Sequence, residues 1–301
     1  MMDGYGHPGY AASLAEFGTV RRLSGCGGWI LKRQIPEFPY SDAMGCYPLF
    51  TCEDWSQIKG DLENLQDEVV ALSLVTDPFG MYSVSSLEGC FDRVLRFKEH
   101  FVVDLSRPAE SIVSKHHHYY ARRTGRHVGV ECCAEPAQFT DEWVRLYSHL
   151  IQRHRLKGIK SFSRQAFARQ LLVPGIVMFR ASAHNEVVGA HLWYQQGEVA
   201  YSHLAAMSPR GYELMASYAL YWYALDYFSG RVGWLDLGSA AGVSCNGRAG
   251  LDNFKKGWST GTRTAYFCGR ILNPGQYEEI TGAKGISTTD YFPAYRRGEF
   301  V

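Results

Sequence analysis

The 301-residue sequence lacks several features that would place it in a class of protein at once. Cysteine is sparse, with 8 residues and no CxxC pair, so neither a disulfide framework nor a paired-cysteine zinc site is indicated. The longest strongly apolar stretch, Ala216–Phe228, falls short of the ~20 residues that a bilayer span requires. The first residues do not show the basic and then apolar segments of a secretory signal. We therefore predict a cytoplasmic protein with reduced thiols, no structural metal and no membrane helix.

The sequence also lacks an excess of charge of either sign. Lysine and arginine together number 31, against 30 for aspartate and glutamate, which gives a formal net charge of +1. No global field therefore draws the protein to nucleic acid or to an anionic membrane, and any polyanion must be held by a local patch. Two segments rich in basic and aromatic residues, 114–127 and 153–170, could form such a patch or could be solvated helix faces.

What the sequence does have is the composition of a globular chain, with 46% hydrophobic and 14% aromatic residues. Hydrophobic periodicity indicates strands and helices interleaved along the chain, which is the order of an α+β protein. Residues 1 to about 22 show no clear period and are interpreted as either a loose lead-in or an edge element. We predict strands at 29–36, 69–80, 95–105, 234–237 and 264–271, a three-stranded meander within 175–208, a loop at 36–48, and helices at 51–66, 108–123, 140–155, 163–172 and 212–228.

No motif of a nucleotide-binding or covalent-catalytic site occurs, since Walker, GxGxxG and GxSxG patterns are all missing. The segment 208–217, which opens a long apolar helix, holds a single glycine, Gly211, followed by bulky and acidic residues. We interpret it as a plain helix start capped by Ser208 rather than as a phosphate loop. The glycine-rich segment 238–250 is interpreted as a loop that rims a site.

The segment GLDNFKKGWS at 250–259 is the most informative short stretch. Lys255 and Lys256 lie between Phe254 and Trp258. Aromatic surface beside a lysine excludes water and so strengthens the contact of its ammonium group with a phosphate or a developing oxyanion. The alternative is a surface turn whose two aromatic side chains fill the core.

Histidines and one aspartate are candidates for proton transfer. His191 and His203 fall on strands of the predicted meander, and Asp236 falls at the end of a strand before the glycine-rich segment. Each is either a proton acceptor or a satisfied core residue. The three consecutive histidines at 116–118 point about 100° apart on a helix and cannot converge on one metal ion.

Five segments spread over residues 71–258 carry a resemblance to a known family. They are ALSLVTDPFG at 71–80, FVVDLSRPAESIVSKHHHYYARRTGR at 101–126, VVGAHLWYQQGEVAYSHLAAMSPRGYELMASYALYWYAL at 187–225, WLDLG at 234–238 and GLDNFKKGW at 250–258. In this order they resemble the FemAB-like branch of the GNAT superfamily, the acyl-CoA N-acyltransferase fold. The resemblance implies an α+β, GNAT-like fold in which a mixed sheet is flanked by helices. It also implies two tandem units, a degenerate GNAT-like one at 1–130 and the acyltransferase domain at 131–301.

Members of this family join an acyl group to an amine, and the best-known branch takes an aminoacyl group from aminoacyl-tRNA. There the motif that corresponds to Phe254-Lys255 lies in the acyl-transfer site, so the resemblance implies that Lys255 stabilises charge on the tetrahedral intermediate or the leaving group. Other members use acyl-CoA; the missing phosphate loop at 208–217 argues against CoA, although that loop is degraded throughout the FemAB-like branch. Members that act on peptidoglycan often carry a helical-hairpin arm, whereas this sequence has no pair of long heptad-patterned helices, which favours a small-molecule amine.

We therefore expect an amide-forming N-acyltransferase that transfers an aminoacyl group from aminoacyl-tRNA to an amine of a small-molecule or peptide acceptor, with no bound cofactor. The alternatives are an acyl-CoA-dependent N-acyltransferase and a non-catalytic GNAT-like module that binds RNA or a protein partner. The sequence leaves the oligomeric state open. The expected catalytic residues are Lys255, His203 and Asp236, and the expected donor- or substrate-binding residues are Phe254, Lys256, Trp258, Arg122, Arg123 and Tyr212.

Overall fold

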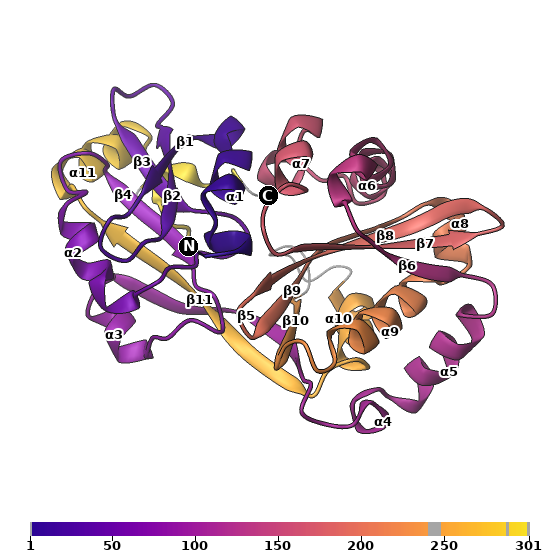
Figure 1. The fold of residues 1–301 in the computed structure, drawn as a ribbon. Coiled ribbons are helices and arrows are strands. Elements are labelled where there is room, and N and C mark those ends of the chain that lie inside the picture. The colour runs from indigo at the N-terminus through magenta and orange to yellow at the C-terminus, as the bar shows by residue number, and fades with distance from the viewer. Residues whose placement is uncertain (1, 240–247, 287–288, 300–301) are drawn as a thin grey trace. The chain divides into compact units, whose positions relative to one another are not determined.

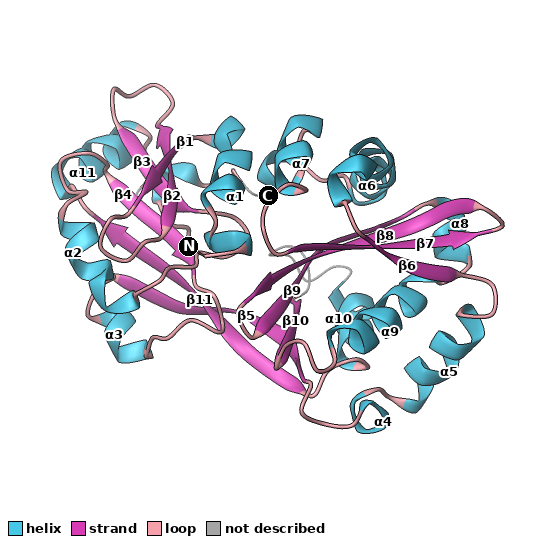
Figure 2. Ribbon diagram, viewed as in Figure 1, coloured by secondary structure: helices cyan, strands magenta, loops and turns pink. Residues whose placement is uncertain are grey.

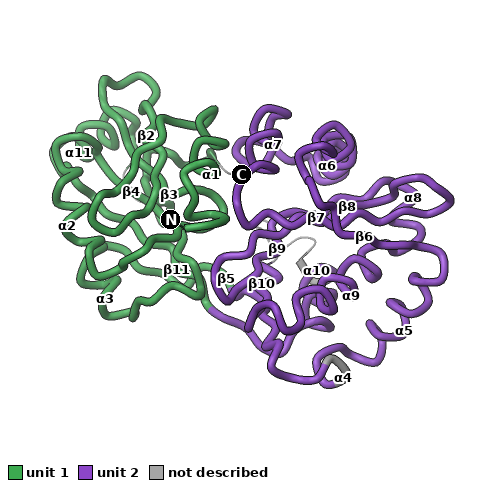
Figure 3. Tube along the Cα trace, in the orientation of Figure 1, with its two compact units in different colours: residues 1–98, 264–301 green, residues 99–263 purple. Residues whose placement is uncertain are grey.

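A computed structural model describes residues 2–239, 248–286 and 289–299 of the chain (Figures 1 and 2). The chain divides into two compact units, one formed by residues 1–98 and 264–301 and the other by residues 99–263 (Figure 3). It passes between them within two strands, β5 (Arg93–Asp104) and β11 (Gly261–Ile271). This division differs from the expected one at residue 130, because residues 99–130 fold together with the second unit.

The first unit is a mixed sheet with helices around it (Figure 2). Its strands β1, β2 and β3 are antiparallel neighbours, β3 runs parallel to β4, and β4 is antiparallel to β11. Phe50, Trp55 and Leu72 lie in its hydrophobic core. The bounds of these elements are β1 (Thr19–Arg22), β2 (Trp29–Gln34), β3 (Ser41–Gly45), β4 (Ala71–Val75), α1 (Pro8–Ser13), α2 (Ile58–Glu63), α3 (Val84–Glu88) and α11 (Pro274–Ala283).

Tertiary packing determines the structure of two segments of this unit for which the local sequence gave an open or a wrong prediction. Of the two interpretations of residues 1–22 the packed one holds, since Tyr10 on α1 is fully buried and its hydroxyl donates to the Tyr47 carbonyl at 2.6 Å. The segment 36–48 was predicted as a loop, and this is wrong: it contains β3. Pairing of β3 with both β2 and β4 and the burial of Asp42 override the turn-forming residues around it.

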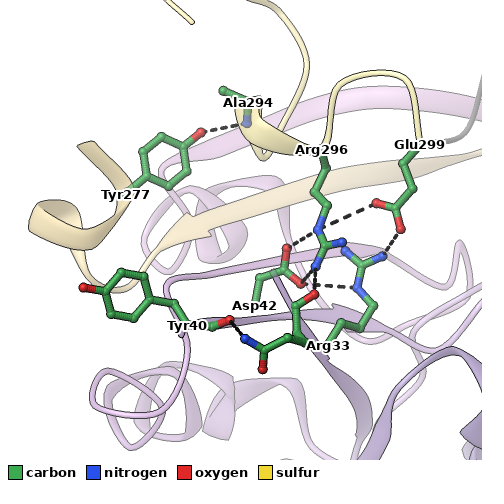
Figure 4. Close-up of polar contacts among 8 residues, drawn as sticks. Arg33, Tyr40, Asp42, Tyr277, Ala294, Arg296 and Glu299 are labelled. Carbon is green, nitrogen blue, oxygen red and sulfur yellow. Dashed lines mark hydrogen bonds and ion pairs between the residues drawn. The ribbon is translucent and has the colours of Figure 1, made fainter. Parts of the chain in front are cut away.

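A network of ion pairs ties the end of the chain to the sheet of the first unit (Figure 4). Asp42 on β3 is fully buried, and its two carboxylate oxygens accept hydrogen bonds from Arg296 at 2.8 and 3.0 Å. Arg33 on β2 lies 3.3 Å from the same carboxylate and donates to Glu299 at 2.7 Å. Two arginines thus depend on one buried carboxylate, which holds residues 294–299 against the sheet.

The second unit is a six-stranded mixed sheet within the described residues, with helices on both faces (Figure 1). The strand order is β5-β10-β9-β8-β7-β6; β9 and β10 are parallel and the other neighbours are antiparallel. The bounds are β6 (Gly129–Cys133), β7 (Ile176–Ala183), β8 (Glu186–Gln196), β9 (Val199–Met207), β10 (Trp234–Gly238), α4 (Ala109–Ile112), α5 (Lys115–Thr124), α6 (Thr140–His154), α7 (Arg164–Gln170), α8 (Pro209–Glu213), α9 (Ala216–Phe228) and α10 (Arg248–Lys256).

Helix α9 is the centre of the second unit. It is apolar on nearly all sides because the sheet, α5 and α10 surround it, and its side chains pack with Phe179, Trp193 and Trp258. Helices α6 and α7 lie over the opposite face of the sheet (Figure 1). Packing of α5 against α9 is also the reason why residues 99–130 belong to this unit.

Most of the elements predicted for the second unit are confirmed. The meander is β7–β9, and the helices at 140–155 and 163–172 are α6 and α7. The helix predicted at 212–228 is broken at Met215, which has a φ of 55°, and the one predicted at 108–123 is broken before Ser114. The segment at 208–217 is a helix start as expected, with the Ser208 side chain accepting from the Gly211 amide at 3.1 Å. Of the glycine-rich segment 238–250, residues 240–247 lie outside the described residues.

The fold class is α+β, a mixed sheet flanked by helices, in agreement with the sequence. Within the described ranges, none of the helices combines the length and the apolar character needed to cross a membrane.

We predict that Asp42→Asn destabilises the protein strongly, because it leaves Arg33 and Arg296 close together without their shared buried carboxylate. Removing one partner of a buried ion pair costs about 3–5 kcal/mol of unfolding free energy. Urea unfolding followed by circular dichroism measures the loss. The matched control is Asp141→Asn, whose exposed pair with Arg164 is solvated and whose loss should leave the midpoint unchanged. Equal effects of the two substitutions would contradict this account of the network.

Candidate functional site

The candidate site lies where β10 ends in the second unit. Strands β9 and β10 pair only through Trp234–Asp236 and Val199–Tyr201, so the parallel pairing stops at Asp236. The pairing of β10 with β5 shifts register between Asp236 and Gly238, and Gly238 has a φ of 73°. This left-handed turn lets the Gly238 amide donate to the Asp236 carboxylate at 2.7 Å.

The Asp236 carboxylate is buried and has a second partner, a histidine on the neighbouring strand. Asp236 is 2% exposed, and His100 on β5 places Nδ1 at 3.0 and 2.8 Å from its two oxygens. His100 is itself 7% exposed. A buried carboxylate needs such donors, because an unpaired charge in the interior is costly. The arrangement also fixes the orientation of the imidazole ring.

The ammonium group of Lys255 reaches the same turn from α10. Lys255 is 8% exposed, and its Nζ donates to the Ser239 carbonyl at 2.7 Å. A Cβ atom at Gly238 would lie 3.3 Å from Nζ, so this glycine leaves room for the ammonium group. The three residues from Asp236 to Gly238 therefore hold a buried carboxylate at one end and approach a buried cation at the other.

Aromatic rings enclose the helix that carries Lys255. The Phe254 ring lies 5.0–5.1 Å from the rings of Tyr218 and Tyr221 on α9, and the fully buried Trp258 stacks on Tyr221 at 5.8 Å. Burial raises the pKa of Tyr221 to about 12, so its phenol stays neutral. Phe254 and Trp258 thus pack in or against the core, as one reading of the sequence had it, and Lys255 between them is itself buried.

Helix α5 is docked against the end of α10 through His117. His117 Nε2 donates to the Phe254 carbonyl at 2.9 Å, and Nδ1 lies 2.8 Å from the Ser114 hydroxyl. The fit depends on Gly257, where a Cβ atom would lie 2.1 Å from the imidazole ring. Burial lowers the pKa of His117, which matches its use as a neutral ring. Its neighbours in sequence contact other groups, His116 the Tyr120 ring and His118 the Trp222 ring.

The two meander histidines lie in the interior. His191 is fully buried with Nε2 at 2.8 Å from the Ser202 hydroxyl, and burial together with the charge of Lys255 lowers its pKa to about 3. His203 is 8% exposed with Nε2 at 3.2 Å from the Gln170 side-chain oxygen, and burial lowers its pKa to about 3. Both imidazoles are therefore neutral at physiological pH.

The structure brings some of the predicted site residues together and leaves others on the surface. Asp236, Phe254, Lys255 and Trp258 belong to β10, α10 and the residues that follow them. Arg122, Arg123 and Lys256 are exposed cations at the ends of α5 and α10, two helices that are in contact. Tyr212 lies on α8, where the guanidinium group of Arg153 covers its ring at 4.2 Å.

His100 is the member of this group that sequence reasoning missed. It falls inside a predicted strand and 136 residues from Asp236, so no spacing rule connects the two. The available signal was a histidine in the apolar half of that strand, next to Phe101, Val102 and Val103. With His100 included, the turn after β10 gathers a carboxylate, an imidazole and an ammonium group, the set needed to move a proton and to stabilise an oxyanion.

Part of the chain matches a known protein family. Residues 114–255 match the acetyltransferase (GNAT) domain family. This part of the chain is therefore similar to GNAT-type acetyltransferases, and it contains both Asp236 and Lys255. No curated protein sequence matches the chain.

Solved structures extend the likeness in fold to nearly the whole chain. The crystal structure of FemX has a TM-score of 0.64 at 14% identity and covers 91% of this chain and 93% of its own. The C-terminal domain of a putative lysylphosphatidylglycerol synthetase from Agrobacterium fabrum has a TM-score of 0.63 at 14% identity, with 91% and 89% covered. L-PGS from Bacillus licheniformis has a TM-score of 0.56 at 14% identity, with 94% and 98% covered. The GNAT-like fold expected from the sequence, a mixed sheet flanked by helices, is thereby confirmed.

We predict that the protein loses stability as the pH falls from about 6.5 towards 5. The pKa of His191 and of His203 is about 3 in the folded protein against an ordinary 6.5, so the unfolded chain binds more protons in this range. Each histidine contributes a loss of up to about 1.4 kcal/mol per pH unit, and above pH 6.5 the effect vanishes. Urea unfolding at pH 7 and pH 5 measures it.

The variant His203→Gln should make the pH dependence shallower by one proton, whereas His184→Asn, at an exposed turn, should leave it unchanged. A wild-type stability that does not change between pH 7 and 5 would show that the two histidines are not held neutral.

We predict that Gly257→Ala weakens the contact between α5 and α10, because the added methyl group overlaps the His117 ring. Overpacking of this kind costs about 1–3 kcal/mol of unfolding free energy. The matched control is Gly250→Ala on α10, which meets nothing within 4 Å and should stabilise the helix by up to about 1 kcal/mol. Thermal unfolding of both variants tests this; a Gly257→Ala protein as stable as the wild type would contradict the docking role of the glycine.

Proposed function

We propose that this protein is an amide-forming N-acyltransferase that transfers an aminoacyl group from aminoacyl-tRNA to an amine of a small-molecule or peptide acceptor. The observation that carries the proposal is the buried ammonium group of Lys255, held beside the turn that follows Asp236 in a GNAT-type domain. An aminoacyl ester is already reactive, so such an enzyme needs to align the amine, accept a proton and stabilise an oxyanion.

Lys255 is suited to the role of oxyanion stabiliser. Lys255 is 8% exposed, and one of the groups that its ammonium group contacts is the neutral carbonyl of Ser239. A negatively charged oxygen accepts a stronger hydrogen bond from an ammonium group than a neutral carbonyl does, and the low local dielectric enlarges the difference. The tetrahedral intermediate would therefore gain an interaction with Lys255 that the ester substrate lacks, which is the condition for catalysis.

The sequence offered two proton acceptors, and the geometry favours one of them. His203 holds a proton poorly, since burial lowers its pKa to about 3, and its Nε2 faces Gln170. Asp236 lies in the same turn that Lys255 reaches and is already linked to an imidazole. We therefore favour the Asp236 side of the site.

Three observations support a tRNA donor over CoA. At the start of α8 the Gly211 and Tyr212 amides donate to the side chain and carbonyl of Ser208, so they are not directed at a pyrophosphate. The exposed Arg122, Arg123 and Lys256 provide cations for the phosphates of a larger donor. One structural neighbour is named a putative lysylphosphatidylglycerol synthetase, and the lysyl part of that name denotes an aminoacyl group.

We predict that Lys255→Met lowers the rate of acyl transfer by about 10²–10³-fold, the usual effect of removing an oxyanion donor. Unfolding temperature and donor binding should change little, because methionine keeps the length of the side chain and its packing. The control is Lys59→Met, an exposed lysine of the first unit, which should keep the wild-type rate. Transfer by Lys255→Met at the wild-type rate would remove Lys255 from the mechanism.

The donor is identified by filter binding to a mixed aminoacyl-tRNA pool, with thermal shift against acetyl-CoA and longer acyl-CoAs in parallel. Binding to charged tRNA that weakens steeply with salt is the expected result. Stabilisation by an acyl-CoA without tRNA binding would overturn the tRNA donor in favour of the acyl-CoA-dependent enzyme. Binding of neither would leave the non-catalytic module as the better account.

A further inference from the structure

We propose that His100 is the catalytic residue that accepts the proton of the attacking amine, and that Asp236 is the positioning residue that holds it. This inference rests on the proposed function and assigns the proton transfer within the same site. The juxtaposition behind it is a histidine on β5 paired with a buried carboxylate on β10, one turn away from the ammonium group of Lys255.

The hydrogen bonds of His100 determine which of its nitrogens can accept a proton. Nδ1 lies 2.8 and 3.0 Å from the two oxygens of a carboxylate, which can only accept, so Nδ1 carries the ring proton. In the neutral ring Nε2 then holds a lone pair. Nε2 makes no hydrogen bond with the described residues.

The other histidines of the interior do not share this arrangement. His117 uses Nε2 on the Phe254 carbonyl and Nδ1 on Ser114. His191 uses Nε2 on Ser202, and its Nδ1 is enclosed. His203 faces the side chain of Gln170. Among the buried histidines of the described second unit, His100 is the one that contacts a carboxylate.

His100 and Lys255 both adjoin the turn after β10, as a proton acceptor and an oxyanion donor of one reaction would. Gly238 is the Cα partner of Phe101, next to His100, and its amide donates to Asp236. The same glycine leaves the space that Lys255 Nζ occupies. The proton acceptor and the oxyanion donor thus both adjoin the segment 236–239, where we place the substrate carbonyl.

The amine nitrogen forms a bond to the ester carbonyl carbon, the carbonyl electron pair moves to oxygen beside Lys255, and one amine proton passes to His100 Nε2. The intermediate then collapses, the carbon–oxygen bond of the ester breaks, and the departing hydroxyl oxygen takes the proton from His100. The products are the amide and the uncharged tRNA hydroxyl, and His100 is neutral again.

The test uses the full-length protein with a mixed aminoacyl-tRNA pool or acetyl-CoA as donor and hydroxylamine as the amine, and measures the hydroxamate formed. His100→Ala should lower the enzymatic rate by about 10²-fold or more while donor binding and the unfolding temperature stay near those of the wild type. Added imidazole should restore part of the rate of His100→Ala and none of Lys255→Met. The matched control His184→Asn, at an exposed turn, should react like the wild type.

A second measurement reads the ring directly and does not need activity. In a long-range ¹H–¹⁵N spectrum of the wild-type protein, neutral His100 should carry its proton on Nδ1, and Asp236→Asn should change this signal and respond to imidazole less than His100→Ala does. A neutral ring protonated on Nε2 would overturn the proposal. Because the spectrum is recorded on the wild-type protein, this test holds even where His100→Ala fails to fold.

The outcomes separate this inference from the proposed function. A wild-type protein that forms hydroxamate, together with a His100→Ala protein that keeps its rate, would overturn the role of His100 and leave the acyltransferase intact. A wild-type protein that accelerates hydroxamate formation from neither donor would overturn the proposed function, and the role of His100 with it.

Discussion

The burial of one carboxylate organises the candidate site. Asp236 is 2% exposed, and an unpaired carboxylate there would cost more free energy than the fold can spare. The chain satisfies it with the Gly238 amide, which requires the left-handed turn at the end of β10, and with His100, which requires the register of β10 on β5. The turn so formed has no side chain at Gly238, and Lys255 occupies the space. The burial of this carboxylate thus positions the imidazole and leaves the space that the ammonium group occupies.

A second constraint holds the lysine in place. Helix α10 is fixed by the Phe254 and Trp258 rings in the core and by α5, which docks on its end through His117 and the space left at Gly257. The same aromatic packing that stabilises the domain fixes the helix that carries Lys255. Core packing by Phe254 and Trp258 and the proposed catalytic role of Lys255 are therefore compatible within this segment. A change that loosens α5, even far from Lys255, is expected to act on the site through α10.

The sequence predicted the parts of this account that depend on local pattern. Alternating and helical periods located the meander and helices α6 and α7, and the Phe254-Lys255 motif pointed to the lysine through a family resemblance. It could not predict features that depend on distant pairing. Strand β3 forms because it pairs with β2 and β4. His100 is paired with a carboxylate 136 residues away in the sequence. Gly257 is needed because the His117 ring from α5 packs directly against it. The division of the chain within β5 and β11 is likewise set by tertiary contacts. A boundary inside a strand has no signal in the local sequence, so the boundary expected at residue 130 differs from it.

The most direct measurement of the central claim is a crystal structure of the protein with a phosphonate analogue of the tetrahedral intermediate, in which an adenosine ester and an amine are joined through phosphorus. The account predicts a phosphonate oxygen within hydrogen-bond distance of Lys255 Nζ and the amine-derived nitrogen within reach of His100 Nε2, with His100 still paired to Asp236. An analogue bound elsewhere in the domain, or bound at this turn with neither contact, would contradict it.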